Sequence, residues 1–271
     1  MLFDPLPRFG RPPLIEVALS IRFESLEELT NAHLGLLWAD FRSDFPGVEI
    51  HPPLQLGIEQ FGVPSPAPFE ITVETEPPKL RYWFLNDPRS ELVQVQADAF
   101  AHNWRRTSGS PDYPHYDRIR SSFLAHLGRF RAFLKRERLR DIAPIQCEVT
   151  YVNHILAGEG WEKPSDLGEV TTLWAPGQSE SFLPDAEDVR LGARYVMADG
   201  AGNPLGRLYV NLEPGYRQKP LLVLRLTARG RPDGQGMEGA LRFLDRGHEW
   251  IVRGFASLTT PRMHAIWERV Q

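Results

Sequence analysis

Two long amphipathic stripes constrain what this chain can fold into more than any other feature. The first lies within residues 113–138 and repeats apolar side chains at spacings of three and four, namely Ile119, Phe123, Leu127, Phe130 and Leu134. The second keeps the same spacing over a longer stretch, through Met237, Leu241, Leu244, His248, Ile251, Phe255 and Leu258. Such a repeat places apolar side chains on one side of an α-helix. Each stripe therefore predicts a long helix whose apolar side must be buried by another layer of the protein.

Segments with a two-residue alternation predict that other layer. Over residues 14–24 every second side chain is apolar, as in a β-strand with one buried face. Further strands are expected over residues 49–61, 69–74, 79–85, 91–99, 145–156, 189–198, 205–213 and 220–228, with a less regular one over 169–174. Shorter helices are expected over residues 26–45 and after the Thr260-Pro261 pair. The connections between strands are too short for crossover helices, so antiparallel pairing is expected.

The order of these elements predicts an α+β fold made of two similar halves, residues 1–141 and 142–271, that form one compact unit. Each half is expected to be a mainly antiparallel sheet packed on one long amphipathic helix. Two short matches suggest a duplication, because both occur at an offset of about 130 residues. They are Glu16-Val17 with Glu148-Val149, and Leu92-Val93 with Leu222-Val223.

Composition excludes several classes of protein. Hydrophobic residues make up 42% of the chain, enough for a sizeable core, and the net charge of −4 gives no overall attraction for nucleic acid. The single cysteine, Cys147, excludes an internal disulfide and a thiolate zinc cluster. Residues 1–13 lack the pattern of a signal peptide, and no apolar run is long enough to predict a membrane span. We therefore expect a soluble, cytoplasmic protein of bacterial type.

Several short motifs follow one another along nearly the whole chain. They are Pro12-Pro13-Leu14-Ile15-Glu16-Val17, Gln94-Val95-Gln96, Asn103-Trp104-Arg105, Tyr113-Pro114-His115-Tyr116, Thr150-Tyr151-Val152-Asn153 and His264-Ala265-Ile266-Trp267. Together they resemble a sporadically distributed family of uncharacterised prokaryotic proteins of about this length. The resemblance implies no activity, because none is assigned to that family. A sporadic distribution is typical of accessory genes, including defence and toxin–antitoxin modules.

The strand expected over residues 91–99 is the first candidate for a binding surface. Gln94, Gln96 and Asp98 share one face of it, and Asn103 and Arg105 follow shortly after. Amide and guanidinium groups on a rigid sheet can bind a ligand through hydrogen bonds, and arginine pairs with carboxylate or phosphate through two of them. A sheet with one solvated face would show the same pattern.

The strand expected over residues 145–156 is the second candidate. Cys147, Val149, Tyr151 and Asn153 share one face, so a mostly buried face ends in a hydroxyl and an amide that need hydrogen-bond partners. A structural network and a binding site are both consistent with this pattern. The complete set of candidate ligand-binding residues is Gln94, Gln96, Asp98, Asn103, Arg105, Tyr151 and Asn153.

No motif assigns a catalytic residue, a cofactor or a metal. The histidines form no metal-binding motif, and Cys147 is expected to face a sheet interior, where thiols are inert. The glycine-rich residues 230–236 lack the Lys-Ser/Thr pair of a phosphate-binding loop and are expected to connect a strand to the second long helix. The sequence leaves catalysis open and leans against it, with no cofactor and no metal assigned.

Residues 101–140 carry an excess of basic side chains, ten against three acidic ones. The ten are Arg105, Arg106, Arg118, Arg120, Arg129, Arg131, Lys135, Arg136, Arg138 and Arg140. Such a surface can attract phosphates in a salt-dependent way, or it can be a solvated helix face paired with the acidic residues 159–188. The second interpretation is favoured, since the sequence has no recognition-helix or zinc-finger motif.

These observations favour a non-enzymatic binding or regulatory protein of an accessory prokaryotic system, such as a defence or toxin–antitoxin system. A protein partner or a second copy of the chain is the expected partner, because the second long stripe and Trp267 would suit an interface, although the core could equally bury them. One alternative is a small-ligand-binding or enzymatic cavity between the sheet and the helices, lined by the seven candidate residues. Another is a nucleic-acid binder that uses residues 105–140.

Overall fold

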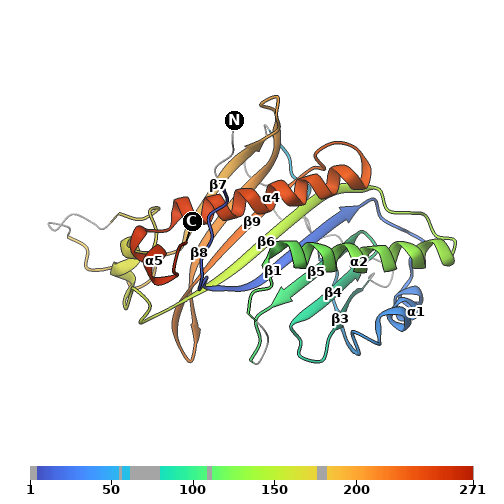
Figure 1. Cartoon of the computed structure of the whole chain (residues 1–271), viewed down its shortest axis with the longest axis horizontal. Coiled ribbons are helices and arrows are strands. Elements are labelled where there is room, and N and C mark those ends of the chain that lie inside the picture. The colour runs from blue at the N-terminus through green and yellow to red at the C-terminus, as the bar shows by residue number, and fades with distance from the viewer. Residues whose placement is uncertain (1–4, 55–56, 62–79, 109–111, 176–181, 271) are drawn as a thin grey trace.

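One antiparallel sheet of nine strands runs through the molecule, with the order β2-β3-β4-β5-β1-β6-β9-β8-β7 (Figure 1). The structure is a computed structural model that describes residues 5–54, 57–61, 80–108, 112–175 and 182–270. The strands are β1 (Leu14–Phe23), β2 (Gly47–His51), β3 (Arg81–Leu85), β4 (Glu91–Gln96), β5 (Ala99–Arg105), β6 (Pro144–Leu156), β7 (Leu191–Ala198), β8 (Pro204–Arg217) and β9 (Lys219–Gly230). Helices and strands are mixed, as expected for an α+β fold.

The two long helices lie on the same face of this sheet (Figure 1). The helix α2 (His115–Arg136) contacts β5 and β1, and α4 (Gly236–Leu258) contacts β6, β9 and β8. The shorter helices are α1 (Asn31–Phe41), α3 (Leu167–Val170) and α5 (Pro261–Ile266), with a 3₁₀ turn, η1, at Pro164–Asp166. Both helices predicted from the amphipathic stripes are therefore present.

The two-residue alternation of the strands separates the core from the open face of the sheet. In β1 the side chains of Val17, Leu19, Ile21 and Phe23 are fully buried and belong to the core beneath the helices. Their neighbours Glu16, Ala18, Ser20 and Arg22 line a hollow on the opposite face. Aromatic rings fill the space between sheet and helices, for example Phe100 of β5 against Phe130 of α2, with ring centroids 5.5 Å apart. This burial of large apolar side chains is the main stabilising contribution to the fold.

Strands β1 and β6 lie next to each other near the middle of the sheet. They pair antiparallel, with Ala18 opposite Thr150 and Leu19 opposite Val149. Moving outward from β1 the strands are β5, β4, β3 and β2, and moving outward from β6 they are β9, β8 and β7. Each long helix therefore covers one of these central strands and the strand beside it.

Four expected elements differ from the structure. The strand expected over residues 91–99 ends at Gln96, and a turn at Ala97-Asp98 reverses the chain into β5, so Asp98 lies in the turn and not on the strand face of Gln94 and Gln96. The strand expected over residues 49–61 ends at His51, because Pro52 and Pro53 lack the backbone N–H that a strand ladder requires. The helix expected from residue 26 begins at Asn31, where the Thr30 side chain accepts a hydrogen bond from the backbone of His33. Residues 167–170 form the short helix α3 instead of part of a strand. The strand expected over residues 69–74 lies outside the described residues.

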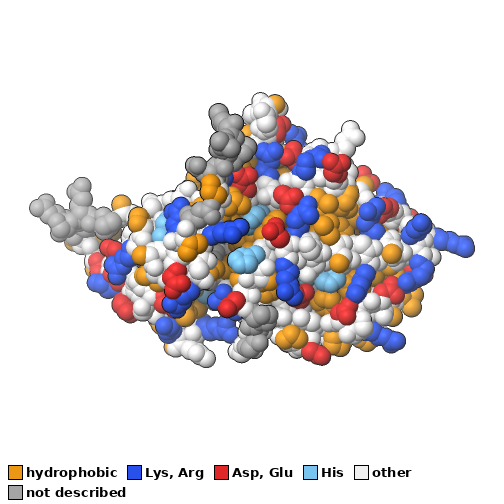
Figure 2. All heavy atoms as spheres, viewed as in Figure 1, with side chains coloured by type: hydrophobic (Ala, Val, Ile, Leu, Met, Phe, Trp, Pro, Cys, Tyr) orange, Lys and Arg blue, Asp and Glu red, His pale blue; other side chains and the backbone are white. Residues whose placement is uncertain are grey.

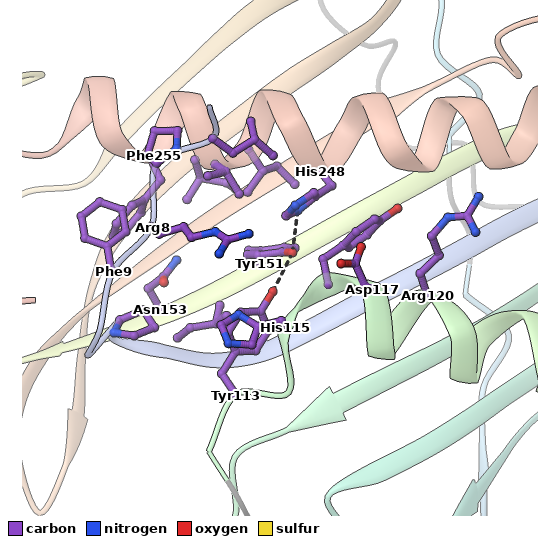
Figure 3. A pocket seen from close by; sticks show the side chains of 18 of the residues that line it. Arg8, Phe9, Tyr113, His115, Asp117, Arg120, Tyr151, Asn153, His248 and Phe255 are labelled. Carbon is purple, nitrogen blue, oxygen red and sulfur yellow. Dashed lines mark hydrogen bonds between the residues drawn. The ribbon is translucent and has the colours of Figure 1, made fainter. Parts of the chain in front are cut away.

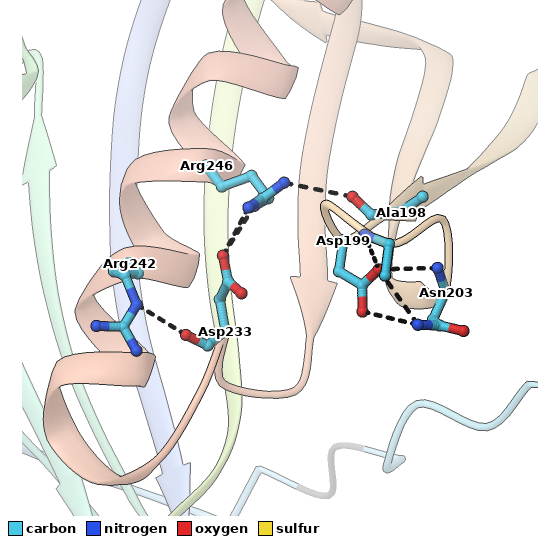
Figure 4. A network of polar contacts seen from close by, with 7 residues as sticks. Ala198, Asp199, Asn203, Asp233, Arg242 and Arg246 are labelled. Atoms are coloured by element: carbon cyan, nitrogen blue, oxygen red, sulfur yellow. Dashed lines mark hydrogen bonds and ion pairs between the residues drawn. The ribbon is translucent and has the colours of Figure 1, made fainter.

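The glycine-rich residues 230–236 connect β9 to α4, as predicted (Figure 4). Gly234 and Gly236 have positive φ angles of 106° and 56°, which the turn requires and which favour glycine. Arg246 of α4 donates to Asp233 Oδ2 at 2.7 Å and to the carbonyl of Ala198 at 3.3 Å. These two hydrogen bonds connect α4 to the loop that precedes it and to the end of β7. Among the described helices, none combines the length and apolar character that crossing a bilayer requires.

Candidate ligand-binding site

A cavity of ≈ 730 Å³ opens between the sheet and the two long helices. Side chains from β6 and β9 line it on the sheet side, and α2 and α4 line it on the helix side. The N-terminal residues 6–9, 12 and 14 line the remaining side (Figure 3). Small-molecule sites in proteins are typically cavities of this size, mostly apolar with a few polar groups.

Three polar side chains from separate elements form a hydrogen-bonded chain in the cavity. The Tyr113 hydroxyl lies 3.1 Å from the Tyr151 hydroxyl, which lies 2.8 Å from Nδ1 of His248 (Figure 3). Tyr113 precedes α2, Tyr151 lies in β6 and His248 in α4. Only the folded chain brings these three groups together.

Burial keeps this Tyr113–Tyr151–His248 chain uncharged at neutral pH. It lowers the pKa of His248 to about 4, although the carboxylates of Asp117 and Asp245 act in the opposite direction. Burial raises the pKa of Tyr113 to about 12 and that of Tyr151 well above its ordinary value. A general acid or base works best with a pKa near the operating pH. The three side chains of the Tyr113–Tyr151–His248 chain are therefore better suited to hydrogen bonding with a ligand than to proton transfer.

Tyr116 joins α2 to α4 along one wall of the cavity. Its ring stacks on the ring of His248, with centroids 3.9 Å apart and planes 3° from parallel. Its hydroxyl donates to Asp245 Oδ1 at 2.8 Å, and the same carboxylate accepts two hydrogen bonds from Arg120, at 2.6 and 3.0 Å. Burial raises the pKa of the Tyr116 hydroxyl, which stays protonated. This arrangement fixes the position of His248.

Two charged side chains line the cavity without an opposite charge beside them. Arg8 and Asp117 are both exposed, and neither forms an ion pair within the described part of the chain. In the view of Figure 3 the Arg8 guanidinium and the Asp117 carboxylate lie on opposite sides of the Tyr151 hydroxyl. An unpaired charge in a cavity can form charge-assisted hydrogen bonds with a ligand.

His115 has a strained backbone at the entrance to α2. It is the first residue of that helix, lines the cavity and has a φ of 64°, in the left-handed region that non-glycine residues rarely adopt. Such a conformation costs of order 1–3 kcal/mol and persists only where the surrounding structure enforces it. Strain of this kind is frequent at binding sites, which agrees with the other features of the cavity.

The structure divides the seven predicted site residues between the two faces of the sheet. Tyr151 and Asn153 line the cavity, where the Asn153 amide donates to the carbonyl of Leu224 at 3.1 Å. The other five, Gln94, Gln96, Asp98, Asn103 and Arg105, do not line it. The prediction that all seven line one cavity between sheet and helices is therefore wrong.

The strand register explains this separation. Asn103 pairs with Ala18, and Ala18 pairs with Thr150 on its other side. Paired residues point to the same face and successive residues to opposite faces. Asn103 thus shares a face with Thr150, and Tyr151 points to the helix side.

The five residues on the open face or at its edge bond to one another and to nearby charged groups. Gln94 donates to Asn103 at 2.7 Å, and Asn103 donates to Glu16 Oε1 at 2.6 Å. The same Glu16 oxygen accepts from Arg105 at 3.2 Å. Gln96 donates to Asp98 at 2.5 Å, and Asp98 pairs with Arg22 at 3.1 Å. A ligand-binding role for these five residues stays a prediction.

The most informative residues of the cavity were not among the predicted site residues. Arg8, Tyr113, Tyr116, Asp117 and His248 come from the N-terminal segment, α2 and α4. His248 lies on the apolar stripe of its helix, so the periodicity predicts a core histidine. The Tyr113–Tyr116 segment belongs to the motifs on which the family resemblance rests, and that was the available signal.

The basic stretch of residues 101–140 is largely paired with acidic side chains. Six of its arginines form ion pairs: Arg105 with Glu16, Arg120 with Asp245, Arg129 with Asp44, Arg131 with Asp141, Arg136 with Asp40 and Arg140 with Glu24. None of these acidic partners comes from the described residues of the segment 159–188, in contrast to the expected pairing with that segment. Positive and negative side chains alternate over the helix-covered face (Figure 2). This pattern does not resemble the extended basic surface of a nucleic-acid-binding protein.

Within the described ranges, no cluster of three or more histidine, cysteine or acidic side chains is placed to hold a metal ion. Cys147 is buried, which raises the pKa of its thiol. No protein-family model, curated protein or solved structure matches the chain. The resemblance based on short motifs therefore stays a prediction.

Proposed function

We propose that this chain is a non-enzymatic small-molecule-binding protein whose site is the cavity between the sheet, α2 and α4. One observation carries the proposal: the unpaired side chains of Arg8 and Asp117 face the same ≈ 730 Å³ cavity around an uncharged Tyr113–Tyr151–His248 chain. Charges that have no partner in the protein favour a ligand that supplies one. The aromatic lining supplies the apolar contact that small-molecule sites use for affinity.

The ligand that fits is zwitterionic or carries an anionic group and a polar group at opposite ends. Its anionic end would pair with Arg8, through the two parallel hydrogen bonds that a guanidinium offers a carboxylate. Its ammonium or hydroxyl end would donate to Asp117. Its middle would receive hydrogen bonds from the tyrosine hydroxyls and contact Phe9 and Phe255, two rings whose centroids lie 5.3 Å apart. Free amino acids and their short derivatives belong to this class.

A thermal-shift screen followed by titration calorimetry tests the proposal. The screen compares amino acids and dipeptides with molecules that have only the anionic or only the cationic end. For the best ligand, Arg8→Gln and Asp117→Asn are each expected to raise Kd about tenfold, the effect of losing about 1.4 kcal/mol. Arg11→Gln is the matched control, because Arg11 lies in the same segment but does not line the cavity. Equal affinity in all four proteins would exclude this site.

We further propose that ligand binding serves a regulatory role in an accessory prokaryotic system, in the cytoplasm, through a protein partner or a second copy of the chain. The protonation states of the cavity support binding over catalysis, because His248 and the tyrosines all have pKa values far from neutral. Light scattering with and without the ligand, combined with a pull-down from the native host, tests this role. A chain that remains a monomer and recovers no partner in both states would contradict it.

We also propose that residues 1–141 and 142–271 are two similar halves. The outward orders β1-β5-β4-β3 and β6-β9-β8-β7 support this, each followed in sequence by a long helix on the same face. The match of Glu16-Val17 with Glu148-Val149 agrees with this proposal. It aligns Ala18 of the first half with Thr150 of the second half, and these two residues also pair with each other in the sheet. The match of Leu92-Val93 with Leu222-Val223 disagrees, since β4 and β9 occupy different places in the two halves.

A further inference from the structure

The face of the sheet opposite the helices carries a segment of the chain that crosses the strands. This crossing segment comprises the described residues 52–54 and 57–61, which belong to no strand. It contacts Gln96 at the end of β4, Gln146 near the start of β6, and Arg207 and Tyr209 in β8. The open face of the sheet therefore already binds one extended stretch of polypeptide.

Two glutamines hold the backbone of this segment. Gln96 accepts from the backbone N–H of Leu54 at 2.9 Å and donates to its carbonyl at 3.2 Å. Gln146 accepts from the N–H of Glu59 at 2.8 Å and donates to the carbonyl of Gly57 at 3.2 Å. A side-chain amide has one acceptor and one donor group, so it can satisfy both backbone groups as a neighbouring strand would. Contacts of this kind recognise an extended main chain whatever its side chains.

The open face also selects an acidic side chain. Glu59 of the crossing segment accepts a hydrogen bond from the Tyr209 hydroxyl at 2.7 Å and forms an ion pair with Arg207, and its side chain is only 6% exposed. Arg207 in turn lies over the ring of Phe61, 4.5 Å from its centroid. This face therefore holds, in its own chain, a stretch of main chain together with one buried acidic side chain, and a peptide with an acidic side chain is the type of ligand that it fits.

Beside the crossing segment the same face has a hollow of ≈ 250 Å³. It is lined by the small side chains of Ala18, Ser20 and Ala101 and by larger polar or aromatic ones that include Arg81, Trp83, Gln94, Asn103 and Arg225. Two buried donor atoms of these lining residues, Nε of Arg81 and Nε1 of Trp83, have no acceptor among the described residues. Arg225 is exposed and forms no ion pair within the same part of the chain. Buried donors without acceptors are rare in folded proteins and favour a ligand that supplies oxygen atoms.

We propose that this hollow is a docking site for an extended acidic peptide of a partner protein, lying beside the crossing segment. The amides of Gln94 and Asn103 would contact its backbone, as Gln96 and Gln146 do in the crossing segment. Trp83 and Arg81 would donate to its carbonyl oxygens, and Arg225 would pair with an acidic side chain. The site is separate from the small-molecule cavity, which lies on the other face of the sheet.

The charges of the face favour a peptide over a nucleic acid. Glu16, Asp98 and Glu148 lie on it or at its edge and pair with Arg105, Arg22 and Arg229. A phosphate backbone would place a negative charge beside these carboxylates at every nucleotide, whereas a peptide needs only Arg225 to pair with an acidic side chain. Binding of single strands also relies on several stacking aromatic rings in series, and Trp83 is the one aromatic side chain among the described residues of the hollow.

Binding to an array of ten-residue peptides tests the proposal. Half of the array has Asp or Glu at alternate positions, and the matched half has Asn or Gln there. Acidic peptides are expected to bind preferentially, with Kd measured by fluorescence polarisation for the best one. Arg225→Gln is expected to raise this Kd about tenfold. Trp83→Phe keeps an aromatic ring but removes the N–H together with the five-membered ring that carries it, and is expected to raise Kd about threefold.

Two controls make the outcome decisive. Arg217→Gln removes an exposed arginine from the same β8–β9 hairpin outside the hollow, and should leave peptide binding unchanged. Arg8→Gln should also leave it unchanged, which separates this site from the small-molecule cavity. No preference for acidic peptides, an equal loss with Arg217→Gln, or tighter binding of a single-stranded oligonucleotide that Arg225→Gln weakens would each overturn the proposal. Thermal unfolding of every variant identifies a loss caused by misfolding.

Discussion

Tyr116 of α2 and His248 of α4 lie face to face, with ring centroids 3.9 Å apart and planes 3° from parallel. The two rings connect helices that cover different central strands, β1 and β6. Because Tyr116 also donates to Asp245 of α4, the contact combines stacking with a charge-assisted hydrogen bond. The seam between the helices is thus stabilised at the wall of the cavity.

Replacement of Tyr116 should separate these two contributions. Tyr116→Phe keeps the stacked ring and loses the hydrogen bond, so the free energy of unfolding should fall by about 1–2 kcal/mol. Tyr116→Leu loses both the stacked ring and the hydrogen bond, so its free energy of unfolding should fall by about 2–4 kcal/mol. Urea unfolding measures both values, with Tyr216→Phe as a control because Tyr216 is 76% exposed. Equal losses for Phe and Leu would show that the stacking contributes nothing.

Acid should destabilise the protein because three histidines with lowered pKa values, the buried His102 and His126 and the partly buried His248, must become charged. Burial lowers the pKa of His102 to about 3 and those of His126 and His248 to about 4. In the unfolded chain each histidine binds a proton below its ordinary pKa of about 6.5. The unfolded state then holds more protons than the folded state, so the stability decreases as the pH decreases. The stability is fully present above pH 6.5 and is lost progressively as pH falls toward the folded-state values.

Urea unfolding at pH 7 and pH 5 measures this effect. We expect a decrease of about 1–2 kcal/mol for each of these histidines over this interval. His248→Gln should reduce the decrease by one such increment, whereas Tyr216→Phe, at a position that is 76% exposed and carries no histidine, should not. A stability that is the same at both pH values would contradict the neutral state of these rings in the fold.

Gly230 should not tolerate a side chain. A Cβ atom there would lie 2.4 Å from the carbonyl oxygen of Leu205 and 2.7 Å from the ring of Phe243, where β8, β9 and α4 meet. Gly230→Ala should lower the free energy of unfolding by about 3 kcal/mol or more, since backbone has to move. Gly128→Ala should instead raise it by about 0.5–1 kcal/mol, because this helical position has open space around it. Equal effects at both positions would contradict the close approach at Gly230.

Gln146 should hold the crossing segment on the sheet. In Gln146→Leu the backbone N–H of Glu59 loses its acceptor. The loss of one hydrogen bond, worth about 1 kcal/mol, should make hydrogen exchange at the Glu59 amide roughly fivefold faster. Hydrogen–deuterium exchange resolves this amide. Gln94→Leu is the control, since the Gln94 side chain bonds to Asn103 and Arg81 instead of the crossing segment. Unchanged exchange at Glu59 would show that the glutamine does not hold the segment.

The local elements of this fold follow from the sequence, but their spatial combination does not. The spacing of Ile119 to Leu134 and of Met237 to Leu258 predicts α2 and α4, because one-sided burial of a helix needs that period. The alternation in residues 14–24 predicts β1 for the same kind of reason. The strand expected over residues 49–61 is too long, because Pro52 and Pro53 lack the N–H groups that would continue the ladder beyond His51.

The candidate site was predicted only in part, because it depends on register. The alternation within β6 predicts that Tyr151 and Asn153 face inward. The sequence around Asn103 does not show that its side chain faces the other side of the sheet, because that depends on how β5 pairs with β1. His248 resembles a core residue in sequence, and its role emerges only when Tyr151 lies 2.8 Å away. Arg8 has no periodic context at all. Sites assembled from loops and several elements leave little trace in a single sequence.

The direct pairing of β1 with β6 has a consequence for cutting the chain. A polypeptide of residues 1–141 alone would leave β1 as an unprotected outer strand, and residues 142–271 alone would leave β6 in the same state. Both strands are rich in β-branched and aromatic residues, the composition that promotes intermolecular strand pairing. Neither fragment is therefore expected to remain monomeric, and the two together should reassociate along this seam.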